Sequence, residues 1–261
     1  MRRIGEVLQG LSIPINTARD NTEAGDESYH CEVCKDQQWL RVDVEPGHPN
    51  FGRLFPCECL VREREARIAD ELGELSQLQS LYDLTFEAFD SSVPGTEIAY
   101  EAAVAFARNP QGWIFFHGGC GAGKTHLAVA IANAIKQQQN VGVYFRVVPD
   151  LLDQLRATFD PTNGVAYDDR FQQIRNAHLL VLDDLGTEQA TPWAREKLYQ
   201  LINHRYNEQL PTVITSNQDI DRIEDRVRSR LLDRRFSRYV YFDSKLVVDY
   251  RQGKSGHTRK R

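Results

Sequence analysis

A glycine-rich loop between an apolar run and a helical stretch sets narrow limits on how this chain can fold. The pattern G-x-x-x-x-G-K-[ST] is met by Gly118, Gly119, Cys120, Gly121, Ala122, Gly123, Lys124 and Thr125. Glycines let backbone N–H groups turn inward around phosphate oxygens, and the following helix adds the positive end of its dipole. Lys124 is expected to reach the β- and γ-phosphates, and the Thr125 hydroxyl to ligate Mg²⁺. Because an apolar strand precedes the loop and a helix follows it, we predict an ATP site that extends to His126, rather than a glycine-rich turn without a ligand.

Two consecutive carboxylates supply the second half of the expected site. Asp183 and Asp184 follow the apolar run 179–182, and ligands of open α/β sheets bind at the carboxyl ends of the strands. We predict that Asp183 coordinates Mg²⁺ and that Asp184 polarises the attacking water. Asn217 ends the next apolar run, so we expect it to hydrogen-bond the water or the γ-phosphate, although asparagine in such a place is also a common turn-former.

Apolar runs alternate with helical patterns from residue 112 onward. Strands are expected at residues 113–116, 142–148, 179–182, 211–215 and 239–242. Helices are expected at residues 124–138, 149–155, 191–207 and 222–232. Five strands separated by helices predict an α/β fold, namely a parallel sheet with helices on both faces.

Four of the five cysteines are grouped near the N-terminus. Cys31 and Cys34 form one pair, and Cys57 and Cys59 form another. In a cytosolic chain such a group favours a metal site over a disulfide framework, and four thiolates satisfy tetrahedral Zn²⁺. We predict a structural zinc module with these four ligands. Free thiols on a loop are the alternative, and His30 and His48 are possible substitutes for a thiolate.

Hydrophobic spacing suggests how the 261 residues are divided. Residues 4–11 carry apolar side chains at helical spacing, and residues 61–81 carry them along one face of a charged stretch. We expect an N-terminal helix with the zinc module at 1–60, a helical linker at 61–83, an ATPase domain at 84–251 and a basic, disordered tail at 252–261.

Charge is distributed unevenly around a net value of −5. Residues 1–90 hold 9 Lys and Arg against 18 Asp and Glu, whereas residues 222–261 hold 13 against 5. The two ends are therefore expected to meet different partners, with simple solvated charge as the alternative. No apolar run approaches the roughly 20 residues of a membrane helix, and the first residues lack the apolar core of a signal peptide. We expect a cytoplasmic protein without a membrane partner.

Several runs, in this order, resemble the AAA+ class of P-loop ATPases. More narrowly, they resemble bacterial replicative helicase loaders of the DnaC/DnaI type and their relatives, the IstB-type transposition ATPases. The matching runs are 84–87, 118–125, 148–152, 180–186, 203–206, 211–217 and 229–231. The resemblance covers about residues 84–251, and it implies a five-stranded AAA+ sheet without a helical lid, since few residues follow the last expected strand.

The resemblance also implies roles for particular residues. Arg230 would be an arginine finger that reaches the γ-phosphate held by a neighbouring subunit, so the chain would self-associate through its ATP site. Nearby arginines compete for that role: Arg222, Arg226, Arg228, Arg234 and Arg235. Many AAA+ proteins have glutamate where this chain has Asp184, and the shorter side chain predicts slow hydrolysis. The four-cysteine module resembles the zinc-bearing N-terminal modules of some helicase loaders, which implies that the N-terminal region of this chain would hold the helicase.

The resemblance implies an ATP-dependent loader that places a replicative hexameric DNA helicase on single-stranded DNA, and the zinc module and the acidic N-terminal region favour this interpretation. The alternatives are an IstB-type helper that binds duplex DNA and stimulates a transposase, and a regulatory ATP-binding adaptor. Basic and aromatic residues between positions 150 and 176 are candidates for stacking on single-stranded DNA, with burial in the core as the alternative. They are Arg156, Phe159, Tyr167, Arg170, Phe171 and Arg175. The expected cofactors are ATP, Mg²⁺ and Zn²⁺.

Overall fold

The computed structural model describes residues 15–16, 29–139, 141–157, 164–187, 191–243 and 245–247. The chain divides into two compact units, Met1–Arg67 and Ile68–Arg261. The helix expected at residues 4–11 and the tail expected at 252–261 lie outside the described residues. No helix in the described part is long and apolar enough to cross a membrane.

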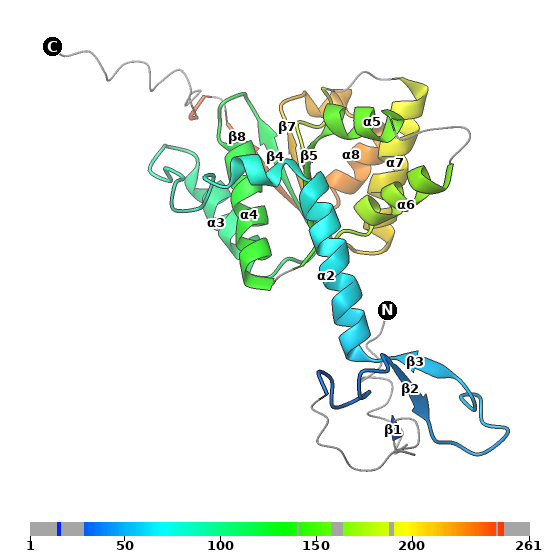
Figure 1. The fold of residues 1–261 in the computed structure, drawn as a ribbon. Helices are drawn as coiled ribbons and strands as arrows, with labels where there is room; N and C mark the ends of the chain where they lie inside the picture. The colour runs from blue at the N-terminus through cyan, green and yellow to red at the C-terminus, as the bar shows by residue number, and fades with distance from the viewer. Residues whose placement is uncertain are drawn as a thin grey trace. The chain divides into compact units, whose positions relative to one another are not determined.

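The larger unit is built on a parallel sheet of five strands (Figure 1). The strands are β4 (Trp113–Gly118), β5 (Val143–Val147), β6 (Leu179–Asp183), β7 (Thr212–Ser216) and β8 (Ser237–Phe242). Their order across the sheet is β5-β6-β7-β4-β8, and every neighbouring pair is parallel. The predicted fold class is therefore confirmed, and the strand that leads into the glycine-rich loop lies between β7 and β8.

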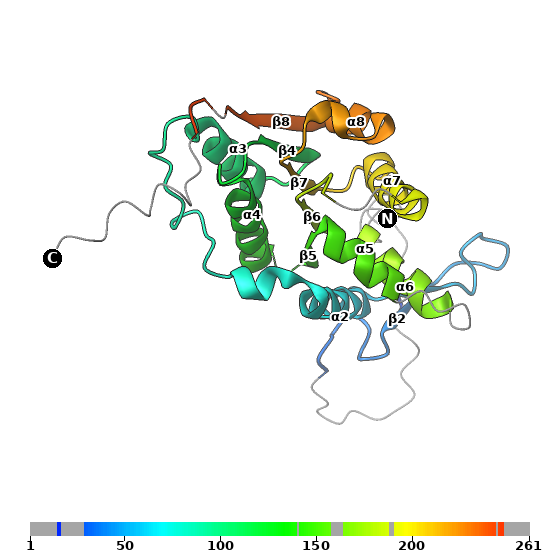
Figure 2. The ribbon, with the colours of Figure 1, turned by 90° about the horizontal axis from the view of Figure 1, so that it is seen from above.

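Helices cover both faces of this sheet, as the view along it in Figure 2 shows. On one face lie α3 (Glu97–Arg108) and α4 (Lys124–Gln139). The other face carries α5 (Val148–Ala157), α6 (Gly164–Arg175), α7 (Pro192–Asn207) and α8 (Asp225–Leu231). Helices α3 and α6 have no counterpart among the elements expected from the sequence.

Alternation along the strands builds one hydrophobic core on each face. In β4, Trp113 and Phe115 join the core with α5 to α8, whereas Ile114 and Phe116 join the core with α3 and α4. All four are at most 1% exposed. Successive side chains of a strand point to opposite faces, so an uninterrupted apolar run such as this one fits a sheet that is buried on both sides.

Two expected helices are interrupted. The helix expected at 61–81 consists of α2 (Glu58–Leu75) and a separate 3₁₀ helix, η1 (Gln77–Leu81). Ser76 has extended backbone angles, and its hydroxyl accepts from Leu78 N and from Phe145 N of β5. A hydroxyl that caps one helix and binds a strand ends the preceding helix.

The expected helix at 222–232 is also shorter than predicted. It consists of a 3₁₀ turn, η2 (Ile220–Arg222), and of α8, which begins at Asp225. Ile223 and Glu224 between them have ψ angles of 136° and 133°, outside the helical region. Ile223 is 6% exposed and belongs to the core with α7 and α8. Burial of its side chain therefore accompanies the break in the helix that the sequence predicted as continuous.

The smaller unit has an antiparallel sheet of three short strands. These are β1 (Ile15–Asn16), β2 (Trp39–Val42) and β3 (Leu54–Pro56), in the order β1-β2-β3. Leu40 and Val42 point to the buried side of β2. The core of this unit joins Leu40 to the cysteines, which leaves few apolar contacts to hold it together.

Candidate functional site

The glycine-rich loop connects the end of β4 to the first residue of α4. Gly118 has φ +143°, and a Cβ there would lie 2.4 Å from the carbonyl oxygen of Phe242 on β8. Gly123 has φ +92°, and its Cβ would lie 2.8 Å from the Phe89 ring. Larger residues would clash at both positions and be strained at both, so the glycines set the path of the loop.

Lys124 curls back over this loop. Its Nζ donates to the carbonyl oxygens of Gly118 at 3.0 Å and Gly119 at 2.6 Å, and the residue is 5% exposed. The side chain therefore lies inside the turn where backbone N–H groups and the start of α4 favour an anion. Cys120, in the same loop, is exposed.

Strands β6 and β7 bring oxygen atoms to the loop. The Thr125 hydroxyl donates to Asp183 Oδ1 at 2.9 Å, and the Thr215 hydroxyl donates to the same oxygen at 2.7 Å. Burial raises the pKa of Asp183, because desolvation disfavours its charged form, and the two hydroxyls oppose that shift. A hydroxyl and a carboxylate that face each other are hard oxygen donors of the kind that Mg²⁺ requires, so these residues fit the expected ion.

Asp184 occupies a left-handed backbone conformation, with φ +60°. Its N–H donates to Thr215 Oγ1 at 2.9 Å, and the Asn217 amide donates to Asp184 Oδ1 at 2.6 Å. Non-glycine residues in this conformation cost free energy and gather at functional sites. The structure therefore brings the three polar residues predicted at the strand ends together, with Asn217 holding the Asp184 carboxylate.

Thr215 is the residue of this site that the sequence reasoning missed. Its hydroxyl donates to Asp183 and accepts from the Asp184 backbone, so one side chain orients both acids. The signal was present, since Thr215 lies two residues before Asn217 on the adjacent strand. Polar residues in an otherwise apolar central strand are buried only with partners.

His126, expected to extend the ATP site, contacts the segment that precedes α3. Its Nε2 lies 2.8 Å from the carbonyl oxygen of Thr85, and its ring meets the Phe89 ring edge-on at 5.2 Å. Phe89 is also the ring next to Gly123. The structure thus links His126, through Phe89, to the glycine-rich loop.

Among the aromatic residues proposed to stack on DNA, the structure describes the side chain of Phe171. Phe171 is 7% exposed and packs in the core with α5 and α7, so the prediction that it stacks on bases is wrong, because its ring fills the interior. Phe159 lies outside the described residues.

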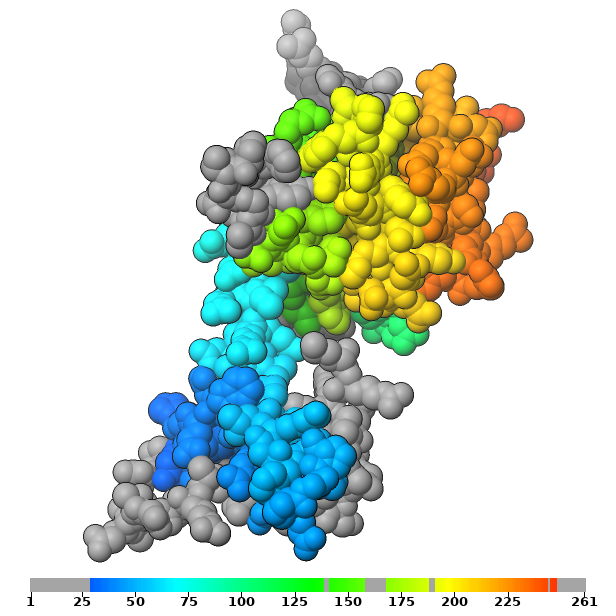
Figure 3. Space-filling model, turned by 90° about the vertical axis from the view of Figure 1, so that its right-hand side faces the viewer, coloured from blue at the N-terminus to red at the C-terminus, as the bar shows by residue number. Residues whose placement is uncertain are grey.

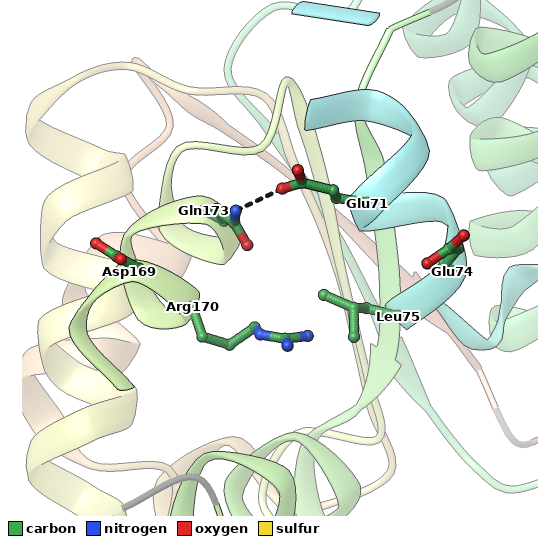
Figure 4. A pocket seen from close by; sticks show the side chains of 6 residues that line it. All are labelled: Glu71, Glu74, Leu75, Asp169, Arg170 and Gln173. Carbon is green, nitrogen blue, oxygen red and sulfur yellow. Dashed lines mark hydrogen bonds between the residues drawn. The ribbon is translucent and has the colours of Figure 1, made fainter. Parts of the chain in front are cut away.

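Arg170 lines a pocket between α2 and α6, which Figure 4 shows. The lining residues are Glu71, Glu74, Leu75, Asp169, Arg170 and Gln173.

Three of the arginines around α8 are paired with acids. Arg226 binds Glu224 at 2.8 Å. Arg228 binds Asp225 at 2.7 Å and Asp221 at 3.2 Å, and Arg235 binds Asp233 at 3.0 Å. Arg222 and Arg234 are exposed. Arg230 differs from these arginines. Within the part of the chain that the structure describes, its half-buried guanidinium donates to neutral groups on α7 and α8.

The four N-terminal cysteines converge. The Sγ atoms of Cys31, Cys34, Cys57 and Cys59 all lie within 4.8 Å of one another. Cys31 and Cys57 are 3.8 Å apart, and Cys34 and Cys59 are 3.3 Å apart. Thiolates bound at about 2.3 Å to tetrahedral Zn²⁺ would be about 3.8 Å apart. The arrangement can therefore hold a metal ion and fits zinc.

Backbone groups support this cluster. The N–H groups of Cys34 and Val33 lower the pKa of the Cys31 thiol to about 7, which favours the thiolate that a metal needs. Hydrogen bonding with Cys34 Sγ raises the pKa of Cys59 to about 12. Crowded thiols resist deprotonation without a cation among them. His30 instead faces Asp36, with its Nδ1 3.6 Å from Oδ2, so four cysteines suffice.

The fold and the site define a P-loop protein of the AAA+ type. The loop-bearing strand β4 lies between β7 and β8, and β7 separates it from β6. Asp183 ends β6 and Asp184 follows it, while β7 carries Thr215 and is followed by Asn217. The chain belongs to the IstB-like ATP-binding protein family, whose model matches residues 51–235.

Proteins named as replicative helicase loaders are similar in sequence to much of this chain. The replicative helicase loader DnaI of Bacillus subtilis is 26% identical over 216 residues, which are 76% of this chain and 68% of that protein. The replicative helicase loader DnaC of Buchnera aphidicola (subsp. Baizongia pistaciae) is 26% identical over 187 residues, covering 70% of this chain and 75% of that protein. A crystal structure of the DnaC helicase loader, 26% identical, aligns with a TM-score of 0.52 over 61% of this chain and 97% of its own.

Proposed function

We propose that this protein is an ATP-dependent loader of a replicative DNA helicase onto single-stranded DNA. The observation that carries the proposal is the convergence of polar residues at the glycine-rich loop. Lys124 lies in the turn, while Thr125 and Thr215 converge on Asp183. Its similarity to the DnaI and DnaC loaders supports the choice of a helicase as partner.

The site is arranged for hydrolysis of ATP. Lys124 would bind the β- and γ-phosphates, and Thr125 with Asp183 would hold Mg²⁺, which neutralises phosphate charge when it is bound. Asp184 would orient the attacking water, with Asn217 fixing its carboxylate. Since Asp184 is one methylene shorter than glutamate and is already hydrogen-bonded to Asn217, we expect slow turnover, with ATP binding acting as a switch.

Arg230 would complete this site on a neighbouring copy. Around α8, Arg226, Arg228 and Arg235 are neutralised by acids of their own chain. Arg230 contacts neutral acceptors, so its charge remains available for a γ-phosphate supplied in trans. The ATP-bound protein would accordingly self-associate.

The zinc module would dock the helicase. It exposes apolar side chains on its sheet, where Trp39 is 41% and Leu54 62% exposed, and in the segment between β2 and β3, where Phe51 is 51% exposed. A unit held by a closed metal site presents such residues on a fixed scaffold. An IstB-type helper that binds duplex DNA is the second candidate, favoured by the family match and by the arginines around α8.

A pull-down separates the two candidates. The intact protein and a variant lacking residues 1–67 would be mixed with the replicative helicase of the same organism, with ATP and Mg²⁺. We expect capture by the intact protein and not by the truncated one, which should still bind a fluorescent ATP analogue. Absence of capture by the intact protein, together with binding to a DNA duplex, would favour the transposition helper.

A further inference from the structure

The guanidinium of Arg230 is held by neutral groups on two helices. Its Nη1 donates to the Arg226 carbonyl oxygen at 2.6 Å, and its Nη2 donates to Asn203 Oδ1 on α7. Its centre lies 5.2 Å from the Tyr199 ring centroid and 5.5 Å from that of Tyr206. Helices α7 and α8 form adjoining parts of the surface in Figure 3, in yellow and orange.

Acids near Arg230 are engaged elsewhere. Asp233 accepts from Arg235 at 3.0 Å and from the Tyr206 hydroxyl, and Glu224 accepts from Arg226 at 2.8 Å. In the part of the chain that the structure describes, no carboxylate forms an ion pair with Arg230. Its Nε is buried and has no hydrogen-bond partner among the described residues.

This arrangement fixes a cation without neutralising it. An amide oxygen accepts a hydrogen bond but carries no net charge, and aromatic faces attract a guanidinium without replacing a counter-ion. A fixed side chain loses little further freedom when an anion arrives, so it stabilises developing charge better than a mobile one. An acid in place of the amide would satisfy the same N–H but would cancel the charge.

We propose that Asn203 and Tyr199 are positioning residues that hold Arg230 for the terminal phosphate bound by another copy of this chain. The inference rests on the proposed function, in which Arg230 acts in trans. Asn203 selects one direction for the guanidinium through Nη2, and Tyr199 supports it from α7.

Asn203→Asp tests the proposal because the replacement is nearly isosteric and differs in charge. We expect the hydrolysis rate of the full-length protein to fall at least about tenfold, toward that of Arg230→Ala. Affinity for ADP should stay within about twofold, because the subunit's own loop is unchanged. Gln172→Glu, the same amide-to-acid change at an exposed position of α6, is the control and should hydrolyse like the wild type.

Mixing subunits distinguishes a misdirected cation from a damaged fold. Lys124→Ala subunits cannot hydrolyse ATP but still present Arg230. Added in excess to Asn203→Asp subunits, they should restore hydrolysis at the intact loops of the latter. Arg230→Ala subunits should not restore it, since neither partner then supplies a working cation.

Each outcome decides one point. If Arg230→Ala hydrolyses like the wild type, the role of Arg230 in the proposed function is wrong, and this inference is overturned with it. If Arg230→Ala is inactive but Asn203→Asp is unaffected, only the inference is overturned. It is also overturned if Asn203→Asp is slow and Lys124→Ala subunits fail to restore it, because the defect then lies in its own site.

Discussion

A buried arginine ties three segments of the ATPase unit together through neutral acceptors. Arg205 is fully buried, and its guanidinium donates to Thr212 Oγ1, to the carbonyl oxygens of Arg175 and Ala177 at 2.9 Å each, and to that of Pro211. Burial lowers its pKa to about 9, so it stays charged at neutral pH. It thereby joins α7 to the chain entering β6 and β7.

Replacing this residue by methionine leaves an unbranched apolar side chain at the position and removes every hydrogen-bond donor of the guanidinium. Three carbonyl oxygens then lose a charged partner inside the protein, at about 1–2 kcal/mol each. We expect Arg205→Met to lower the free energy of unfolding by about 3–6 kcal/mol. For a unit of this size, each kcal/mol shifts the midpoint of thermal unfolding by about 2–4 °C, so the shift should exceed about 6 °C.

Chemical unfolding followed by far-ultraviolet circular dichroism measures this loss. Arg235→Met removes an exposed arginine with one acid partner and should change the free energy by less than about 1 kcal/mol. If Arg205→Met also stays within about 1 kcal/mol of the wild type, with an unchanged dependence on denaturant, the hydrogen bonds of Arg205 do not hold these segments as argued.

The remaining predictions concern the two sites. Gly123→Ala should weaken ATP binding at least about tenfold in a fluorescence titration, because its Cβ would meet Phe89; unchanged affinity would contradict the loop geometry. Asp183→Asn should raise the nucleotide-free unfolding free energy by about 1 kcal/mol and abolish stabilisation by Mg²⁺-ATP. Because the pKa of Asp183 is raised in the folded protein, its protonated carboxyl group contributes stability at pH values below the pKa of the unfolded chain. That contribution is lost as the pH rises through the pKa of the folded state. A strong chelator should release one zinc per chain and unfold the smaller unit, and Cys57→Ser should prevent zinc binding. Retention of that unit's structure without metal would refute the structural role.

Local patterns were enough to predict the loop and its acids. Gly118 and Lys124 belong to a motif whose function depends on backbone shape, and Asp183 follows an apolar strand that must end at the same edge of the sheet. The cysteine spacing was equally informative, because the four thiols are close enough for one ion. The family resemblance supplied Arg230, but not the surroundings that distinguish it from its neighbours.

Long-range contacts account for what the sequence did not predict. The break at Ser76 depends on a hydrogen bond to β5, which lies 69 residues further along the chain. The environment of Arg230 depends on α7 meeting α8, and Asn203 carries no local sign of that role. The sequence around Phe171 is compatible with an exposed ring or a buried one. The packing of α6 against the core shows that the ring is buried.

Helicase loading tests the central claim most directly. The replicative helicase of the same organism would be incubated with circular single-stranded DNA, ATP and this protein, and helicase bound to the circles would be separated by gel filtration and quantified. We predict loading with the wild type and loss of loading with Lys124→Ala, while both proteins still capture the helicase. Equal loading with and without the wild-type protein, or undiminished loading with Lys124→Ala, would contradict an ATP-dependent loader.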